Sequence, residues 1–313
     1  MQRLDVVVIF VYFTILCSVS AWTYPLQTTG CNHQPGRCTL VSGIDVGSED
    51  IQVLPNGLAF ITSGLDPTTP GKIFLFDFKK PRSGVVALDI VGDFDRDTFS
   101  PHGLNIWVDT NRILIYIFVI NHGGKNKETV EKFRFDATSQ NLYHVKTYQD
   151  HRTIIHLNDL VVMGEDSFYF TNFYQFDIKL EILLRLRLGY VGFYDGFRGH
   201  VIIRRLFIPN GLNTSPDGKY VYLTEFSGKT FSVYARMSDN SLCLKQRVPL
   251  CSLVDNIDVD IATGDVWVTG HADLQLNQKY MIPPHTSISP SQVNNYCLCS
   301  SPTVQWLERR TLN

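Results

Sequence analysis

Short polar turns alternate along the chain with stretches in which aromatic and β-branched residues occupy every second position. The pattern recurs as "PNGLAFITSG" (55–64), "DTNRILIYIFVI" (109–120), "GEDSFYFTN" (164–172), "SPDGKYVYLTE" (215–225) and "ATGDVWVTG" (262–270). Such alternation after a turn signal predicts β-strands. A second strand-like stretch follows each repeat, as in 71–78, 129–136 and 228–235. The chain is therefore expected to be all-β.

The spacing of these repeats narrows the architecture. A four-stranded unit that recurs at roughly 40–50 residues is typical of a β-propeller blade. A sandwich of two sheets would explain the strands but not their period. We therefore predict a β-propeller.

One segment departs from the repeat. "FDIKLEILLRLRLGYVGFY" (176–194) carries apolar residues near helical spacing, with Glu181, Arg185 and Arg187 on the other side. The pattern predicts an amphipathic helix inserted between blades. Two roles stay open for it, packing on its own domain and contact with a membrane or lipoprotein surface.

Composition and charge restrict the class of protein. The chain has 313 residues, 44% of them hydrophobic, and a net charge of −2. It contains no basic cluster, so a nucleic-acid partner is not indicated. Residues 1–22 have a short basic start and an apolar run, which indicates a secretory signal, with a retained anchor as the alternative. Residues 23–271 then hold the propeller.

The cysteines agree with an oxidising compartment. Of 7 cysteines, Cys17 lies in the signal segment, and Cys31, Cys38, Cys243, Cys251, Cys297 and Cys299 remain. Disulfides are expected in a secreted chain, but the sequence does not select a pairing. Asn213 begins "NTS", a glycosylation acceptor by pattern.

Acids and amides gather where the innermost strand of each blade should begin. Innermost strands of a propeller surround a central channel, so these side chains should converge there. Converging carboxylate and amide oxygens favour calcium, which takes six to eight oxygen ligands. Neighbouring side chains of an extended strand point to opposite faces, so tandem pairs could serve two separate ions. The residues are Glu49, Asp50, Asn158, Asp159, Asn210, Asp255 and Asn256.

Several motifs are similar to those of the serum paraoxonase/arylesterase family. They include "GSEDIQVLPNGLAFITSGL", "SPHGLN", "VINH", "HLNDLVV", "PNGLNTSPDGKYVYLTE" and "LVDNIDVDIATGDVWVTGH". The resemblance implies a six-bladed propeller with two Ca²⁺ ions, secreted from the cell. It also implies hydrolysis of aryl esters and lactones, with organophosphates as substrates of some members.

The resemblance assigns roles to individual residues. It implies that Glu49, Asn158, Asn210, Asp255 and Asn256 hold the catalytic calcium. It implies that Asp50, Asp159 and the backbone carbonyl of Leu104 hold the structural one. The catalytic histidine pair of the family falls on His102 and His122. A histidine that titrates near neutral pH can take a proton from an attacking water.

The chain also departs from the family pattern. Phe173 and Tyr174 replace an Asp-His pair, and Gly270 stands where some members have a free cysteine. After Ala272 the resemblance stops, so residues 272–313 are expected to leave the sixth blade incomplete, with at most one or two strands docked there. The usual disulfide partner of Cys38 is then missing. The alternative function is therefore an inactive calcium-binding propeller that binds lipid or protein.

Overall fold

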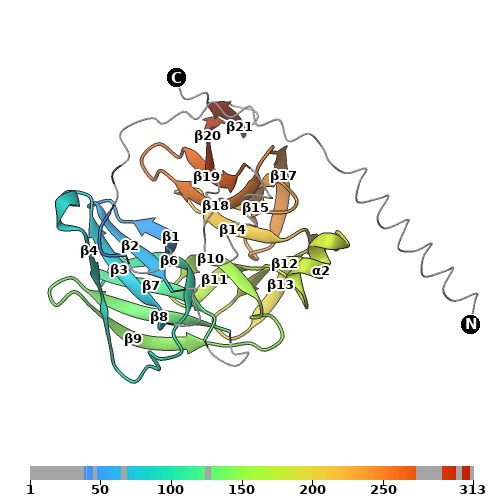
Figure 1. Cartoon of the computed structure of the whole chain (residues 1–313). Helices are drawn as coiled ribbons and strands as arrows, with labels where there is room; N and C mark the ends of the chain where they lie inside the picture. The colour runs from blue at the N-terminus through green and yellow to red at the C-terminus, as the bar shows by residue number, and fades with distance from the viewer. Residues whose placement is uncertain are drawn as a thin grey trace, which may run out of the picture.

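The computed structural model describes residues 39, 41–44, 48–64, 69–123, 128–272, 291–300 and 305–310. These residues form four four-stranded sheets and one five-stranded sheet. The sheets stand around a common centre, and their innermost strands are β1, β6, β10, β14 and β18 (Figure 1). Successive innermost strands pack on one another from β1 to β18. The predicted β-propeller architecture is confirmed.

Each sheet is built mainly from strands that follow one another in the chain. The first sheet contains β1 (Ser48–Val53), β2 (Leu58–Ser63), β3 (Lys72–Asp77) and β4 (Val85–Ala87). The second contains β6 (Pro101–Asp109), β7 (Leu114–Asn121), β8 (Thr129–Asp136), β9 (Asn141–Tyr148) and, parallel to β9, β5 (Asp89–Val91). A single 3₁₀ turn, η1 (Pro81–Ser83), precedes β4.

The other three sheets repeat the antiparallel order. The third contains β10 (Leu157–Gly164), β11 (Ser167–Asn172), β12 (Gly189–Tyr194) and β13 (Gly199–Leu206). The fourth contains β14 (Pro209–Thr214), β15 (Tyr220–Glu225), β16 (Thr230–Arg236) and β17 (Leu242–Pro249). The fifth contains β18 (Leu253–Val259), β19 (Val266–His271), β20 (Ser291–Ser300) and β21 (Gln305–Arg310).

The number of blades is the main correction to the sequence expectation. Six blades were expected, and the described residues form five sheets. The five turn–strand repeats correspond to the second strands, β2, β7, β11, β15 and β19, so each repeat supplies one sheet. The sixth blade was implied by the family resemblance and not by a sixth repeat.

The C-terminal segment belongs to the fifth sheet. β20 pairs with β19 from Tyr296↔Val266 to Ser291↔His271, and β21 pairs with β20. The expectation of at most two strands in residues 272–313 holds for the described part of this segment. These strands complete the fifth sheet instead of starting a sixth, because the edge of β19 is open to pair with them.

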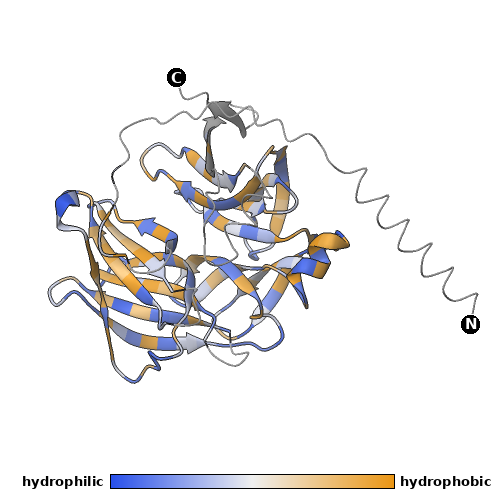
Figure 2. Ribbon diagram, in the orientation of Figure 1, coloured by the Kyte–Doolittle hydropathy of each residue, from blue (hydrophilic) through white to orange (hydrophobic). Residues whose placement is uncertain are grey.

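Strand alternation creates a separate core at each interface between sheets. Ile117 and Val119 of β7 face the first sheet, whereas Tyr116 and Phe118 of the same strand face the third. Tyr222 of β15 likewise faces the fifth sheet, while its neighbours face the third. Because both faces of a blade between two others are buried, apolar residues, orange in Figure 2, recur along the strands of each sheet.

The inserted helix is shorter than expected, and Glu181 lies on its buried side instead of its exposed side. The sequence predicted a helix over 176–194, but α2 spans Ile178–Leu183 and the chain then enters β12. Asp177 caps α2 by accepting the Leu180 backbone N–H at 2.7 Å. Glu181 is fully buried, because its carboxylate accepts the N–H groups of Gln175 and Phe176, and the leucines of this segment face outward.

The structure bears on the predicted glycosylation motif, the cysteines and the membrane-spanning alternative. Asn213 is half-buried and its amide donates to the Ile257 carbonyl at 2.9 Å, so a glycan there would break a contact between sheets. Cys243 and Cys251 are exposed free thiols. Residues 1–22 and Cys38 lie outside the described residues. Within the described part of the chain, no helix is long and apolar enough to cross a membrane.

Candidate active site

A β-bulge at the same place in every innermost strand positions the site. In each strand two consecutive residues lie opposite a single residue of the second strand. The bulge interrupts the simple alternation of side chains, so both members of a pair can approach the centre. The pairs are Glu49-Asp50, His102-Gly103, Asn158-Asp159, Asn210-Gly211 and Asp255-Asn256.

Glycine in two of these bulges lets the neighbouring strand come close. A Cβ atom on Gly103 would lie 2.6 Å from the carbonyl oxygen of Asn158. A Cβ atom on Gly211 would lie 2.6 Å from the carbonyl oxygen of Asp255. Both distances are too short for a side chain. The packing of the centre therefore requires the glycine in "PHGL" and the glycine in "PNGL".

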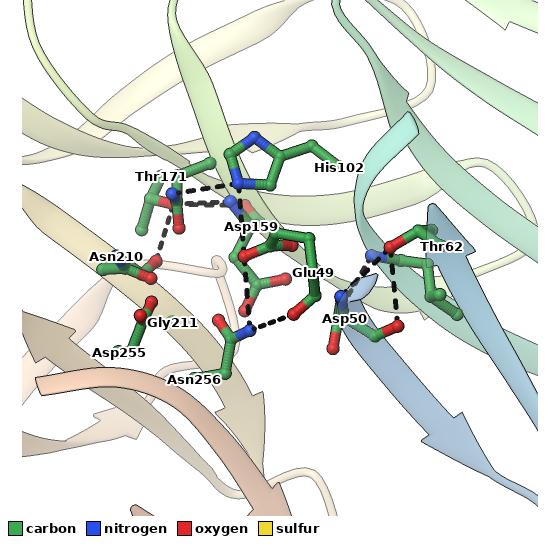
Figure 3. Close-up of polar contacts among 12 residues, drawn as sticks. Glu49, Asp50, Thr62, His102, Asp159, Thr171, Asn210, Gly211, Asp255 and Asn256 are labelled. Atoms are coloured by element: carbon green, nitrogen blue, oxygen red, sulfur yellow. Dashed lines mark hydrogen bonds and ion pairs between the residues drawn. The ribbon is translucent and has the colours of Figure 1, made fainter. Parts of the chain in front are cut away.

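Four of the predicted residues meet directly (Figure 3). Nε2 of His102 lies 3.2 Å from Oε1 of Glu49 and 3.4 Å from Nδ2 of Asn158. Across the centre, Nδ2 of Asn256 lies 3.2 Å from the backbone oxygen of Glu49 and 3.4 Å from its Oε1. These contacts join β1, β6, β10 and β18. They therefore include a direct contact between the first sheet and the fifth.

Three buried oxygens at this meeting point have no hydrogen-bond partner. They are Oε2 of Glu49, Oδ1 of Asn158 and Oδ1 of Asn210. A buried polar atom without a partner costs free energy, so it usually has an unseen ligand or water. All three belong to the residues predicted to hold one cation. The donor set therefore fits a hard cation bound through oxygen.

Asp50 and Asp159 occupy equivalent positions on β1 and β10. Oδ2 of Asp50 accepts the backbone N–H of Leu104 at 2.7 Å, and Oδ2 of Asp159 accepts that of Leu212 at 2.6 Å. Each carboxylate thus joins its strand to the next innermost strand. The prediction for Leu104 concerns its carbonyl as a ligand, whereas its contact with Asp50 is through its N–H.

Both carboxylates are destabilised in the charged form when no cation is present. Burial, and next the charge of Glu49, raise the pKa of Asp50 to about 7. Burial, and next the charge of Asp50, raise the pKa of Asp159 well above its ordinary value. A cation beside them would reverse this effect, because an opposite charge favours the ionised form.

Asp255 lies on the fifth sheet next to a third histidine. Its Oδ2 is 2.9 Å from Nε2 of His271, and its backbone oxygen accepts the Thr224 hydroxyl at 2.6 Å. Asp258 and Asp260 behave as expected for ordinary polar residues. Asp258 is exposed on the same strand, and Asp260 accepts the N–H of Ala262 in a turn.

The two histidines are in direct contact. Nδ1 of His102 lies 2.6 Å from Nε2 of His122, and their side chains are 14% and 24% exposed. Burial lowers the pKa of His122. Burial also disfavours the charged form of His102, but the charges of Glu49, Asp255 and Asp50 outweigh it and raise the pKa. His122 is therefore the neutral partner of the pair.

Sequence analysis missed a set of threonines behind the bulges. The hydroxyls of Thr62, Thr171 and Thr224 each contact the bulge of their own sheet, and Thr269 donates to the Asn256 carbonyl at 3.1 Å. The signal was present, because "ITS", "FTN", "LTE" and "VTG" close four of the five repeats. In the second sheet Ile120 takes this place.

Aromatic rings contact two other histidines, His156 and His271, where the chain departs from the family pattern. Tyr174 stacks on His156 at 4.1 Å between ring centres, and Phe173 lies edge-on to Phe226 at 6.5 Å. Phe226 in turn lies 6.2 Å from His271. Phe173 and Tyr174 thus add aromatic surface near the site.

In chemical terms the site offers two histidines in direct contact and converging oxygens. Within the described ranges, no group of three or more His, Cys, Asp or Glu side chains is placed to hold a metal alone. The converging set is instead mixed, since amide oxygens accompany the carboxylates. Calcium tolerates such a set better than zinc, which prefers nitrogen and sulfur.

Comparison with known proteins gives one family. A family model described as "Arylesterase" matches residues 32–304. Human serum paraoxonase/arylesterase 1 is 40% identical over 248 residues, which cover 75% of this chain and 69% of the relative. Human serum paraoxonase/lactonase 3 is 36% identical over 269 residues, which cover 82% of this chain and 75% of the relative.

Solved structures with low sequence identity share the fold. The periplasmic gluconolactonase of Pseudomonas aeruginosa is 13% identical, with a TM-score of 0.50 over 83% of this chain and 71% of that one. A putative TolB from Agrobacterium tumefaciens is 10% identical, with a TM-score of 0.54 over 81% of this chain and 78% of that one. These likenesses concern the fold alone.

Proposed function

Because the chain belongs to the arylesterase family, we propose that it hydrolyses aryl esters and lactones and depends on calcium to do so. The observation that carries this proposal is the His102–His122 contact of 2.6 Å beside the unpaired oxygens of Glu49, Asn158 and Asn210. The proposed base and the proposed cation site would meet at one point, an arrangement that suits the hydrolysis of an ester by water.

The residues that would hold the catalytic cation are Glu49, Asn158, Asn210, Asp255 and Asn256. Those that would hold a second, structural ion are Asp50, Asp159 and the carbonyl of Leu104. When bound at the first site, calcium supplies positive charge that polarises a substrate carbonyl. The two carboxylates of that site, Glu49 and Asp255, balance its charge.

The histidines would move the proton. Nε2 of His102 faces the centre and accepts a proton from the attacking water. Nδ1 of His102 donates to Nε2 of His122, which is kept neutral by burial and can accept. The Asn158 amide nitrogen lies 3.4 Å from Nε2 of His102 and Oε1 of Glu49 lies 3.2 Å from it, so with Glu49 bound to the cation this nitrogen would keep its lone pair for the water.

The substrate class follows from the surroundings of the pair. The rings of Phe173, Tyr174 and Phe226 favour apolar acyl or aryl groups over charged ones. The proposed substrates also include phosphotriesters, because these too present a polarisable oxygen and carry no net charge.

We also place the protein outside the cell, at a lipid surface. The N-terminal segment of 1–22 is proposed to direct secretion. Beside the site, the α2 segment exposes Phe176, Leu180, Leu183, Leu184 and Leu188, each at least 40% accessible. Exposed Lys179 and Arg185 flank these side chains, which suits phosphate headgroups of a membrane or lipoprotein.

The experiment that tests the function is turnover of phenyl acetate and of a δ-lactone by the purified chain. The proposal expects both substrates to be hydrolysed with calcium present. Calcium binding without turnover of either would favour the alternative of an inactive calcium-binding propeller.

A further inference from the structure

A second carboxylate stands on the far side of the histidine pair from Glu49. Oε1 of Glu128, just before β8, lies 3.3 Å from Nδ1 of His122. Glu49, His102, His122 and Glu128 thus form one continuous row, with contacts of 3.2, 2.6 and 3.3 Å. Glu128 belongs to neither predicted ligand set.

Glu128 is held firmly by its other oxygen. Oε2 accepts the backbone N–H of Leu157 at 2.6 Å, at the start of β10. Oε1 is also 3.7 Å from Nδ1 of His156, whose ring stacks on Tyr174. The side chain is 17% exposed, so the carboxylate has little freedom to turn away. Each oxygen therefore has its own donor.

This arrangement fixes which nitrogen of His122 carries the proton. A carboxylate accepts hydrogen bonds, so Nδ1 facing Glu128 must be the protonated nitrogen. Nε2 of His122 then carries a lone pair, so it can only accept a hydrogen bond, and its donor is Nδ1–H of His102. His102 must then carry a proton on Nδ1. Its Nε2 lies 3.2 Å from the Glu49 carboxylate, so this nitrogen keeps a lone pair toward the centre when Glu49 is engaged by a cation, as in the proposed function. The backbone N–H of His122 donates to the carbonyl of Ser100, which fixes the backbone that carries the ring.

We propose that Glu128 is a positioning residue that sets the tautomers of His122 and, through it, of His102. This inference rests on the proposed function of the pair as base and relay. Without Glu128, His122 could carry its proton on Nε2 and donate it to Nδ1 of His102. The hydrogen bond of the pair would then run in the opposite direction, and His102 would turn an N–H toward the centre instead of a lone pair.

The test reads the tautomer directly in the full-length chain. Long-range proton–nitrogen NMR of protein labelled with ¹⁵N-histidine distinguishes protonated from bare ring nitrogens. The wild-type chain should show His122 with its proton on Nδ1. Glu128→Ala should move that proton to Nε2, and Glu128→Gln, which keeps one acceptor oxygen, should shift it only in part.

A matched control separates positioning from general loss of a buried acid. Glu131 lies on β8, three residues after Glu128, is 3% exposed and sits 2.9 Å from Nε2 of His144. Glu131→Gln should lower the melting temperature but leave the His122 tautomer unchanged. For phenyl acetate, Glu128→Ala should lower kcat roughly 10–100-fold with KM little changed, the usual cost of removing such a partner.

Two outcomes overturn the proposal. One is a wild-type His122 that carries its proton on Nε2, a result that needs no variant. The other is an unchanged tautomer in a folded Glu128→Ala chain. Failure of the proposed function would look different, because an inactive wild-type chain with Nδ1-protonated His122 would still support Glu128 as the positioning residue.

Discussion

Nδ1 of His102 and Nε2 of His122 lie 2.6 Å apart although the residues are 20 positions apart in the chain. The bulge of β6 presents the first ring, and the end of β7 presents the second. The contact joins two strands of one sheet at the edge of the central oxygen cluster. The two histidines of the proposed base and relay pair are thus brought together by the hairpin itself.

Replacement of His102 should remove the base. We expect His102→Gln to slow phenyl acetate hydrolysis roughly 10²–10⁴-fold, the usual contribution of a general base. His122→Gln should cost less, because it acts through its partner. His200→Gln is the control, since His200 contacts Asp195 away from the centre. Full turnover by His102→Gln would show that another group takes the proton.

Removal of calcium should create a pH dependence of stability. Without a cation, Asp50 holds its proton up to about pH 7, whereas the unfolded chain releases it near 3.8. Folding then takes up protons, so the free energy of unfolding should fall as pH rises from about 4 to 7. With calcium bound the carboxylates must be ionised, as they are in the unfolded chain above about pH 5, so this slope should disappear.

The measurement is chemical denaturation of chelated and calcium-loaded protein between pH 5 and 7.5. Asp50→Asn is the control, because it should flatten the slope of the chelated protein. A chelated wild-type protein whose stability rises steadily across this range would contradict the charge arrangement of the centre.

The proposed ligands should differ from their neighbours in calcium affinity. Glu49→Gln and Asp255→Asn each remove one of the two carboxylates that balance the catalytic ion, so both should weaken calcium binding by at least tenfold. Asp258→Asn changes an exposed acid on the same strand as Asp255 and should have little effect. Titration calorimetry gives the comparison, and equal losses in all three would refute the ligand assignment.

The exposed leucines of the α2 segment should govern association with lipid. Leu183→Ser together with Leu184→Ser should reduce sedimentation with phosphatidylcholine vesicles that contain anionic lipid. Phe197→Ser is the matched control, because Phe197 is 91% exposed but lies in the β12–β13 turn. If the leucine variant sediments as the wild type does, the apolar patch does not contact lipid.

Local patterns predicted the sheets well because turns and alternation are short-range signals. Each recognised repeat became the second strand of a sheet, from β2 to β19. The helix was overestimated because "GYVGFY" has apolar residues compatible with either period, and pairing with β11 decided for a strand. A sixth sheet had no repeat to support it and is not found among the described residues.

The site was only partly predictable for a physical reason. Glu49, Asn158 and Asn256 could be found from their types and positions, and the structure brings them together. The bulges depend on contacts across strands, which one strand's sequence does not reveal. Glu128 was missed because its role depends on the packing of β8 against the start of β10, nearly 30 residues away.

The most direct test of the account is recovery of turnover as calcium is returned to the chelated protein. Phenyl acetate hydrolysis should vanish with EDTA and return in proportion to calcium bound at the site of Glu49, with the Glu49→Gln variant needing more calcium for the same rate. Unchanged hydrolysis in EDTA, in a protein shown to be free of calcium, would contradict the account.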